Sequence, residues 1–168
     1  MIVLFYVDDV LVLYHKNHEE QGKQVIAGLK QAYEFKDQGD IEHYLGIRVI
    51  RDRKNRKIYL SHDAYIEKIA KRFNLTEDAC PSMPLPQVEL RKYQGQATKA
   101  EVKEYQEKVG SLLYAAITIR LDVAFASSQL SYFLTNPSPV HRVAVNHAIR
   151  YLYSIRFLGI AYSGFNEG

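Results

Sequence analysis

Two adjacent carboxylates, Asp8 and Asp9, have the clearest potential for chemistry in this sequence. They stand between two short runs rich in Val, Leu, Ile and aromatic residues, at positions 2–7 and 10–14. This pattern predicts a β-hairpin whose tip carries both side chains at the edge of a sheet. Carboxylate oxygens are ligands that Mg²⁺ prefers, so the tip is a candidate metal site. Adjacent aspartates are also ordinary turn residues between strands, and that interpretation stays open.

Other catalytic or ligand-binding signatures are missing from the sequence. Cys80 is the only cysteine, which excludes an intramolecular disulfide and a cysteine-based zinc site and fits a reducing compartment. No two of the histidines have the i,i+4 spacing typical of a zinc-binding helix. The sequence also lacks the nucleophile elbow of hydrolases and the glycine-rich loops that bind phosphates.

The elements expected to position the acidic pair come directly after it. Asn17 with Glu20 resembles a helix start, and apolar residues then recur at helical spacing, so we expect an amphipathic helix packed on the hairpin. Residues 44–50 and 58–61 predict a second hairpin, joined by the polar and basic connection 51–57. The first part of the chain therefore combines strands with helix.

Helices predominate in the rest of the chain. Ser61 can cap a helix that ends before a proline-containing linker at residues 76–96. Three further helices are expected, over 98–118 from a capping box, over 122–134, and from Ser138-Pro139 to about 155, with a strand at 159–163. This order of elements predicts an α+β fold followed by a mainly helical part.

Composition narrows the class of protein only slightly. The chain has 168 residues, 47% of them hydrophobic, which is enough for one domain with a core or two small ones. Its net charge of +3 permits a nucleic-acid partner without demonstrating one. The acidic pair divides the apolar start of the chain and no cleavage site follows, so we expect neither secretion nor membrane insertion.

The motifs, taken in chain order, resemble copia-type retrotransposon reverse transcriptases. Tyr6-Val7-Asp8-Asp9 resembles the acidic signature on the palm hairpin of these enzymes. Further similarities occur at Phe35-Lys36-Asp37, Gly39-Asp40, Tyr44-Leu45-Gly46-Ile47, Ile58-Tyr59-Leu60-Ser61, Val109-Gly110-Ser111-Leu112-Leu113-Tyr114, Asn136-Pro137 and Arg150-Tyr151-Leu152. The similarity spans nearly the whole chain, but Leu121 stands where the family usually has a proline.

The resemblance implies roles for the residues of the hairpin tip. Asp8 would be a direct ligand of the catalytic Mg²⁺ or Mn²⁺, and Asp9 its less strictly required neighbour. Tyr6 and Val7 would lie near the primer terminus. Two-metal phosphoryl transfer needs several carboxylates in fixed geometry, and the family's site includes a further aspartate on a strand upstream of the hairpin. We therefore expect the isolated sequence to hold metal weakly or not at all and to be inactive alone.

The resemblance also implies partners: a template-primer duplex of RNA or DNA, deoxynucleoside triphosphates and an upstream palm-fingers segment, with no membrane partner. Basic residues of the second hairpin and of the following helix are the candidates for phosphate contacts. These candidates are Arg48, Arg51, Lys57, Lys68, Lys71 and Arg72. A solvated hairpin tip and ordinary helix solubility explain the same residues equally well.

By the same resemblance, the chain divides into three regions. Residues 1–62 correspond to the C-terminal part of the palm, with two hairpins and a helix. Residues 63–97 hold the first thumb-like helix and the proline-containing linker, and residues 98–168 form a helical thumb or connection region leading toward a ribonuclease H domain that the sequence lacks. We expect an intracellular protein, in a cytoplasmic retrotransposon particle or in the nucleus. A non-enzymatic nucleic-acid-binding or polymerase-docking module derived from a retrotransposon is the alternative.

Overall fold

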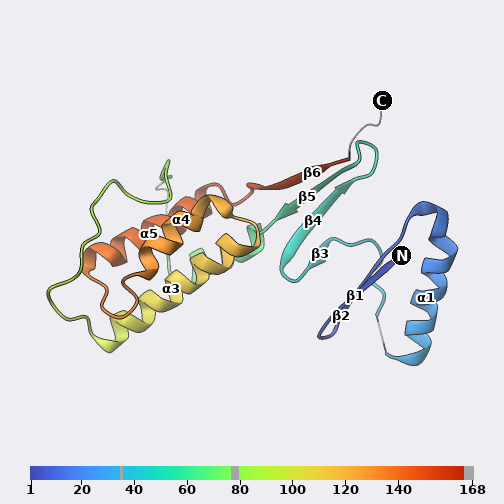
Figure 1. Ribbon diagram of the computed structural model, residues 1–168, viewed down its shortest axis with the longest axis horizontal. Helices are drawn as coiled ribbons and strands as arrows, with labels where there is room; N and C mark the ends of the chain where they lie inside the picture. The colour runs from blue at the N-terminus through green and yellow to red at the C-terminus, as the bar shows by residue number, and fades with distance from the viewer. Residues whose placement is uncertain (35, 77–79, 165–168) are drawn as a thin grey trace. The chain divides into compact units, whose positions relative to one another are not determined.

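The computed structural model describes residues 1–34, 36–76 and 80–164 and has the predicted α+β architecture (Figure 1). Antiparallel strands and helices form the first part of the chain, and helices dominate the second part. The chain divides into two compact units, Met1–Ile41 and Glu42–Gly168. Phe35, the first residue of one of the motifs above, and part of the predicted linker lie outside the described residues.

The first unit opens with the predicted hairpin. Strand β1 (Ile2–Tyr6) pairs antiparallel with β2 (Asp9–Leu13), and Tyr6 opposite Asp9 is the last pair before the tip. Val7, in the turn, has a φ of 50°, a left-handed conformation that is strained for a β-branched residue. The sequence thus predicts the hairpin correctly, and the tip is a tight two-residue turn.

A helix packs on this hairpin, as expected. Helix α1 (Glu19–Ala32) comes after a 3₁₀ turn, Lys16–His18, and its N-cap is His18, so the helix begins later than the predicted Asn17 start. Gly22 lies against the ring of Tyr14 so closely that an added Cβ would stand 2.5 Å from the ring. A larger residue at this position would require the Tyr14 ring to move away from the helix.

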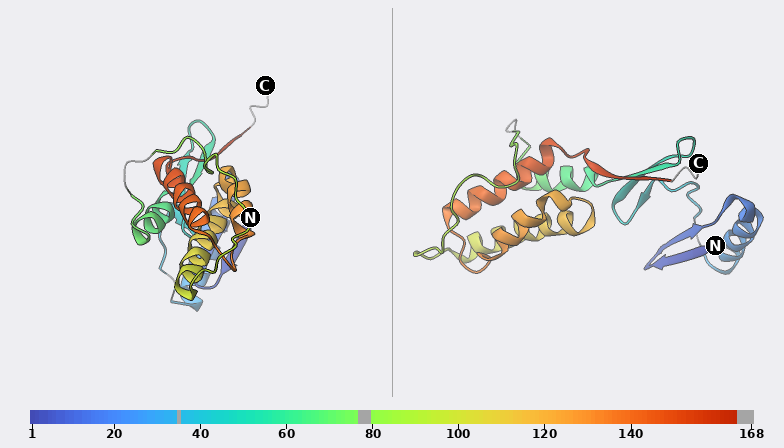
Figure 2. Two further views of the ribbon diagram at one scale, coloured as in Figure 1. Left: turned by 90° about the vertical axis from the view of Figure 1, so that its left-hand side faces the viewer. Right: turned by 45° about the horizontal axis from the view of Figure 1, so that its top comes forward.

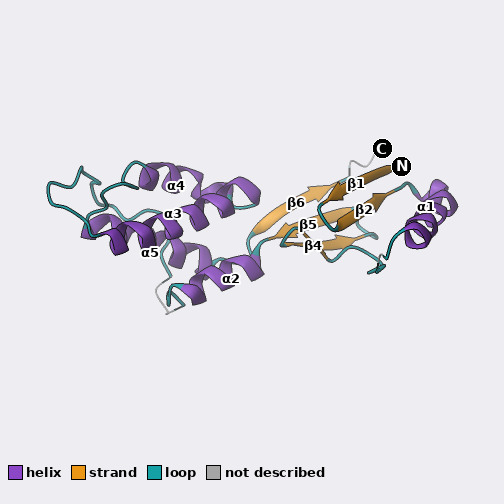
Figure 3. Cartoon of the chain, turned by 90° about the horizontal axis from the view of Figure 1, so that it is seen from below, coloured by secondary structure: helices purple, strands orange, loops and turns teal. Residues whose placement is uncertain are grey.

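The second unit contains a four-stranded antiparallel sheet (Figure 3). Its order is β3 (His43–Tyr44), β4 (Ile47–Asp52), β5 (Lys57–Ser61) and β6 (Gly159–Ser163). The predicted second hairpin corresponds to β4 and β5, and the predicted strand near the end of the chain is β6. Its antiparallel pairing with β5 joins segments that the sequence pattern does not connect.

Four helices form the rest of the second unit and lie side by side (Figure 2). They are α2 (Asp63–Arg72), α3 (Lys99–Thr118), α4 (Ala124–Ser131) and α5 (Pro139–Ser154). Helix α4 is shorter than predicted, because a 3₁₀ turn at Leu121–Val123 precedes it and a turn follows it. None of the described helices is long and apolar enough to cross a membrane.

The core of the second unit lies between these helices. Apolar side chains of α2, α3, α4 and α5 are fully buried in one cluster, among them Ile66, Leu112, Leu130 and Leu152. Tyr105 of α3 is also buried, and its hydroxyl donates a hydrogen bond of 2.8 Å to the carbonyl of Leu130. The predicted capping box at the start of α3 is present, and α5 has one formed by Ser138 and His141.

Candidate functional site

The two candidate catalytic carboxylates lie at the exposed tip of the β1–β2 hairpin. Asp8 is in the turn and Asp9 is the first residue of β2. Tyr6 is directly opposite Asp9, and the Val7 side chain projects into solvent. All four residues of the motif are therefore accessible to a ligand from outside the hairpin.

The donor set of this tip fits a hard divalent cation in part. Two carboxylates offer oxygen ligands of the kind that Mg²⁺ and Mn²⁺ prefer. Mg²⁺ needs about six oxygen ligands in near-octahedral geometry. Among the described residues no three His, Cys, Asp or Glu side chains gather in a cluster that could hold a metal ion. The tip therefore offers part of a metal site.

The six basic candidates all lie in the second unit, and three of them are engaged in ion pairs. Arg48 on β4 pairs with Asp63 at 3.0 Å. On α2, Lys71 pairs with Glu67 at 2.7 Å and Arg72 with Glu107 of α3 at 2.7 Å. Lys68 is exposed and makes no ion pair with any described residue. The positive charge of this helix is thus partly neutralised by neighbouring glutamates.

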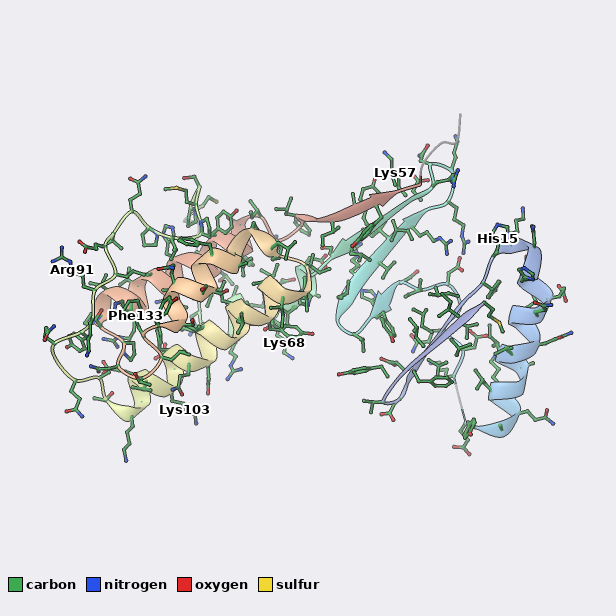
Figure 4. All side chains as sticks on the ribbon, viewed as in Figure 1. His15, Lys57, Lys68, Arg91, Lys103 and Phe133 are labelled. Carbon is green, nitrogen blue, oxygen red and sulfur yellow. The ribbon has the colours of Figure 1, made fainter. Side chains whose placement is uncertain are left out.

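Strand register separates the candidates of the second hairpin, of which Figure 4 labels Lys57. Arg48 lies opposite Ser61, Arg51 opposite Ile58, and Lys57 opposite Asp52. Because side chains alternate along a strand, Arg48 and Lys57 share one face of the sheet and Arg51 is on the other. On α2, Lys68 with Lys71 and Arg72 has i,i+3 and i,i+4 spacing, so these three share a helix face.

A buried ion pair was not anticipated from the sequence. Arg120 is 1% exposed, and its guanidinium binds the Asp122 carboxylate through two hydrogen bonds, of 2.9 and 2.7 Å. A third bond, 3.2 Å long, runs from Arg120 to the carbonyl of Ile155 just beyond α5. Burial alone would raise the pKa of Asp122, but the hydrogen bond and charge of Arg120, together with hydrogen bonds from Tyr151 and from the backbone, outweigh it and lower that pKa. The pair ties the end of α3 to the end of α5.

His62 is a further buried polar residue whose contacts were not anticipated from the sequence. It is fully buried where β5 passes into α2, and its ring stacks on Tyr65 with 4.6 Å between centroids. Its Nδ1 lies 3.1 Å from the Thr118 hydroxyl. Burial lowers the pKa of His62, and the neighbouring Asp63 carboxylate opposes the shift only in part. The histidine therefore links the sheet to α3.

Comparison with known protein families identifies the chain. Residues 1–87, a little over half of its length, match the family model described as reverse transcriptase (RNA-dependent DNA polymerase). The chain belongs to the reverse transcriptase family. The matched part contains the acidic hairpin, α1, strands β3 to β5 and α2.

Retrotransposon relatives extend the reverse transcriptase similarity through the helical part, and they are of the copia type. The chain is 36% identical over 162 residues to the retrovirus-related Pol polyprotein from transposon TNT 1-94 of Nicotiana tabacum, covering 90% of this chain and 12% of the polyprotein. A putative transposon Ty5-1 protein of Saccharomyces cerevisiae is 32% identical, with 95% of this chain and 51% of that protein covered.

A third reverse transcriptase relative is the Pol polyprotein from transposon RE1 of Arabidopsis thaliana. It is 32% identical over 89% of this chain and 10% of the polyprotein. The chain thus spans 51% or less of the length of each of these three relatives. No solved structure matches the chain significantly.

Proposed function

We propose that this chain supplies Asp8 and Asp9 to the nucleotidyl-transfer site of a retrotransposon reverse transcriptase. The observation that carries the proposal is the exposed acidic pair at the tip of the β1–β2 hairpin, within the part of the chain that matches the family. The reaction is RNA-directed DNA synthesis, in which a primer 3′-oxygen bonds to the α-phosphorus of a deoxynucleoside triphosphate and pyrophosphate leaves. The proposed location is intracellular, in a retrotransposon particle or the nucleus.

Each residue of the tip has a distinct part in this proposal. Asp8 is the direct ligand of Mg²⁺ or Mn²⁺, and Asp9 adds negative charge beside it. Tyr6 and Val7 border the primer terminus. The bound cation supplies charge stabilisation for the transferring phosphoryl group.

The site needs further ligands from another segment of polypeptide. Two carboxylates do not fill the coordination of one divalent cation, and the described residues hold no cluster of three potential ligands. In this proposal residues 1–62 are the C-terminal part of the palm and an upstream palm-fingers segment completes the site. The 168 residues alone are therefore inactive and bind metal weakly.

Contacts with the template-primer duplex fall to the second unit. Lys68, Lys71 and Arg72 on one face of α2 meet phosphates of the duplex without reading its bases. Lys68 contributes most, because Lys71 and Arg72 are already paired with glutamates. On the second hairpin Arg48 and Lys57 contact one strand of nucleic acid, and Arg51, on the opposite face, contacts another segment.

Primer extension tests the assignment of the acidic tip. The purified chain is assayed with Mg²⁺ or Mn²⁺ on a primed RNA template, alone and mixed with a palm-fingers fragment of a copia-type relative. Asp8→Asn is compared with Asp37→Asn, a matched change at an exposed aspartate that pairs with Lys30. We expect extension only in the mixture, loss of at least about 100-fold with Asp8→Asn, consistent with a metal ligand, and near-normal rates with Asp37→Asn.

The other outcomes separate the alternatives. Extension by the chain alone contradicts the claim of an incomplete site. If Asp8→Asn and Asp37→Asn reduce the rate of primer extension equally, Asp8 has no specific catalytic role. Salt-sensitive duplex binding without extension in any mixture favours the non-enzymatic nucleic-acid-binding module instead.

A further inference from the structure

An aromatic and basic cluster lies at the end of α5 in the second unit. The Arg156 guanidinium stands 4.6 Å from the ring centroid of Tyr153 and 4.6 Å from that of Phe157. It also donates a hydrogen bond of 3.1 Å to the Tyr153 carbonyl. Cation–π attraction to two rings and this hydrogen bond therefore hold the guanidinium in place, in the turn that follows α5.

Phe157 is the most exposed member of this cluster. It is 69% exposed, whereas Tyr153 and Arg156 are half-buried. The turn itself is fixed, because the carbonyl of Ile155 accepts a hydrogen bond of 2.9 Å from a backbone N–H of the turn and one of 3.2 Å from the buried Arg120. The Phe157 ring is therefore open to a flat partner and stands on a well-supported backbone.

The basic face of α2 adjoins the cluster, because α2 packs against α5. Glu67 of α2 pairs with Lys71 at 2.7 Å and also interacts electrostatically with Arg156. Lys68 is exposed at the next position of α2. The aspartate that begins α2 is already paired with Arg48. Lys68, Lys71 and Arg156 outnumber the one glutamate between them, so the surface beside the open ring has a net positive charge.

We propose that this surface binds single-stranded nucleic acid. The α2–α5 patch consists of Lys68, Lys71, Arg156 and Phe157. An unpaired base stacks on the Phe157 ring, and the two lysines contact the neighbouring phosphates. Every base has a flat π-face, so an aromatic platform beside cations binds single strands with little sequence preference. The family's description as RNA-dependent DNA polymerase favours this partner over an acidic protein or a membrane.

The inference rests on the phosphate contacts proposed above for α2 and adds a preference for an unpaired strand. Bases inside a duplex are stacked on one another, so they cannot use the ring, whereas unpaired bases can. An RNA-directed polymerase always holds such a strand, namely the template that it has not yet copied. Asp8 and Asp9 take no part in this contact. Binding can therefore be measured without catalysis.

The sequence contains no tryptophan, and this gives a direct measurement of stacking. Phe157→Trp places a single tryptophan in the α2–α5 patch, and a base stacked on its ring quenches its fluorescence. Titration with single-stranded RNA of about ten nucleotides should quench the emission, and a blunt duplex of the same length should leave it nearly unchanged. Phe125→Trp, at an equally exposed position of α4 (70%), is the control and should not be quenched.

Fluorescence anisotropy of labelled RNA measures the affinity. Phe157→Leu keeps an apolar side chain but removes the π-face. It should raise the dissociation constant for the single strand at least about fivefold and that for the duplex less than about twofold. Lys68→Glu should weaken the binding of both. Lys103→Glu, the same charge change at an exposed position near the start of α3 (Figure 4), should have a much smaller effect.

The remaining outcomes overturn the inference. It falls if the single strand does not quench the tryptophan of Phe157→Trp, or if Phe157→Leu binds the single strand as tightly as the wild type. If duplex binding still depends on Lys68 in that case, the proposed function stands and only the single-strand site is lost. If the wild type binds neither RNA, the phosphate contacts of the proposed function are wrong as well. Equally strong quenching by vesicles of anionic lipid would assign the patch to a membrane surface instead.

Discussion

At the scale of single residues, the Arg120–Asp122 pair shows why a buried positive charge among apolar helices needs a negative partner. Arg120 makes hydrogen bonds to Asp122 and to the Ile155 carbonyl while it is almost completely removed from solvent. An unpaired charge in such a place is costly, so the carboxylate is required once the guanidinium is buried. Its function is to fix the end of α3 against the end of α5.

Asp122→Asn tests this requirement. The substitution leaves the Arg120 charge buried without a counter-charge, and we expect a loss of about 2–4 kcal/mol in the free energy of unfolding. Urea denaturation measures it. Glu89→Gln, which breaks the exposed Arg91–Glu89 pair at 2.6 Å, is the matched control and should change stability by less than about 0.5 kcal/mol. Equal effects in the two variants would show that burial of Arg120 is not what makes its partner important.

The buried histidines predict a pH dependence of stability. Burial lowers the pKa of His62 and of His141 below the ordinary 6.5. The unfolded chain therefore binds protons more readily than the folded chain, and the free energy of unfolding falls as the pH drops below about 6.5. Asp63 adjoins His62, but its pKa is lowered below 3.8. Its own titration therefore lies outside this pH window.

His62→Phe keeps an aromatic ring on Tyr65 and removes one titrating group. We expect the decrease in unfolding free energy between about pH 7.5 and 5.5 to become smaller in this variant, although its stability at pH 7.5 is lower because the contact with Thr118 is lost. His43→Gln, on exposed β3, should keep the wild-type pH dependence. If the unfolding free energy of His62→Phe depends on pH as strongly as that of the wild type, His62 is not a cause of the pH dependence.

At the scale of elements, the contact between β6 and β5 depends on one glycine. A Cβ at Gly159 would overlap the backbone oxygen of Leu60, and a backbone atom cannot move away as a side chain can. Gly159→Ala should therefore loosen the start of β6 and lower the free energy of unfolding by about 1–3 kcal/mol. Gly110→Ala is the matched control, because its Cβ meets nothing within 4 Å in α3.

The control substitution should act in the opposite direction. Alanine in an exposed helix interior is favoured over glycine, so Gly110→Ala should raise the free energy of unfolding by about 0.5–1 kcal/mol. Thermal and urea unfolding of both variants show whether each substitution raises or lowers the free energy of unfolding. If both substitutions stabilise the protein, the close approach of β6 to β5 at Gly159 does not exist in solution.

Elements with local sequence signals were predictable. The β1–β2 hairpin, α2, and the capped helices α3 and α5 were confirmed because each is specified by alternation, helical spacing or a cap within a few residues. The predicted start of α4 at Asp122 was wrong, because Leu121–Val123 forms a 3₁₀ turn and the helix begins after it. The sequence lacks the proline that would fix φ at a helix start here. The predicted cap of α1 at Asn17 was also wrong, because the observed N-cap is the next residue, His18.

Features that depend on distant partners could not be predicted. The pairing of β6 with β5 places Gly159 opposite Ser61, and the residue pattern of neither strand indicates which strand it pairs with. The neutralisation of Arg72 depends on Glu107, and that of Arg48 on Asp63. The place of Asp8 and Asp9 at a hairpin tip was predictable from the flanking apolar runs. Their catalytic role remains a prediction.

At the scale of the whole molecule, the apolar hairpin of the first unit predicts poor solubility. Phe5 is 66% exposed, and its two-stranded sheet leaves one edge of each strand unpaired among the described residues. Exposed edges of this kind promote aggregation. Phe5→Lys should reduce light scattering on concentration, and Val143→Lys, at a similarly exposed helix position, should not. Greater improvement with Val143→Lys would place the aggregation surface on α5.

The position of β6 governs when the second unit can be completed during synthesis. Strands β4 and β5 leave the ribosome before helices α2 to α5, and β6 emerges after all of them. Until β6 arrives, the outer edge of β5 has no partner within the sheet. During this interval helices α2 to α5, which lie between β5 and β6 in the chain, must fold or at least must not cover the free edge of β5. A nascent chain stalled before residue 159 is therefore expected to be a substrate for chaperones, and release of the last strand would end that dependence.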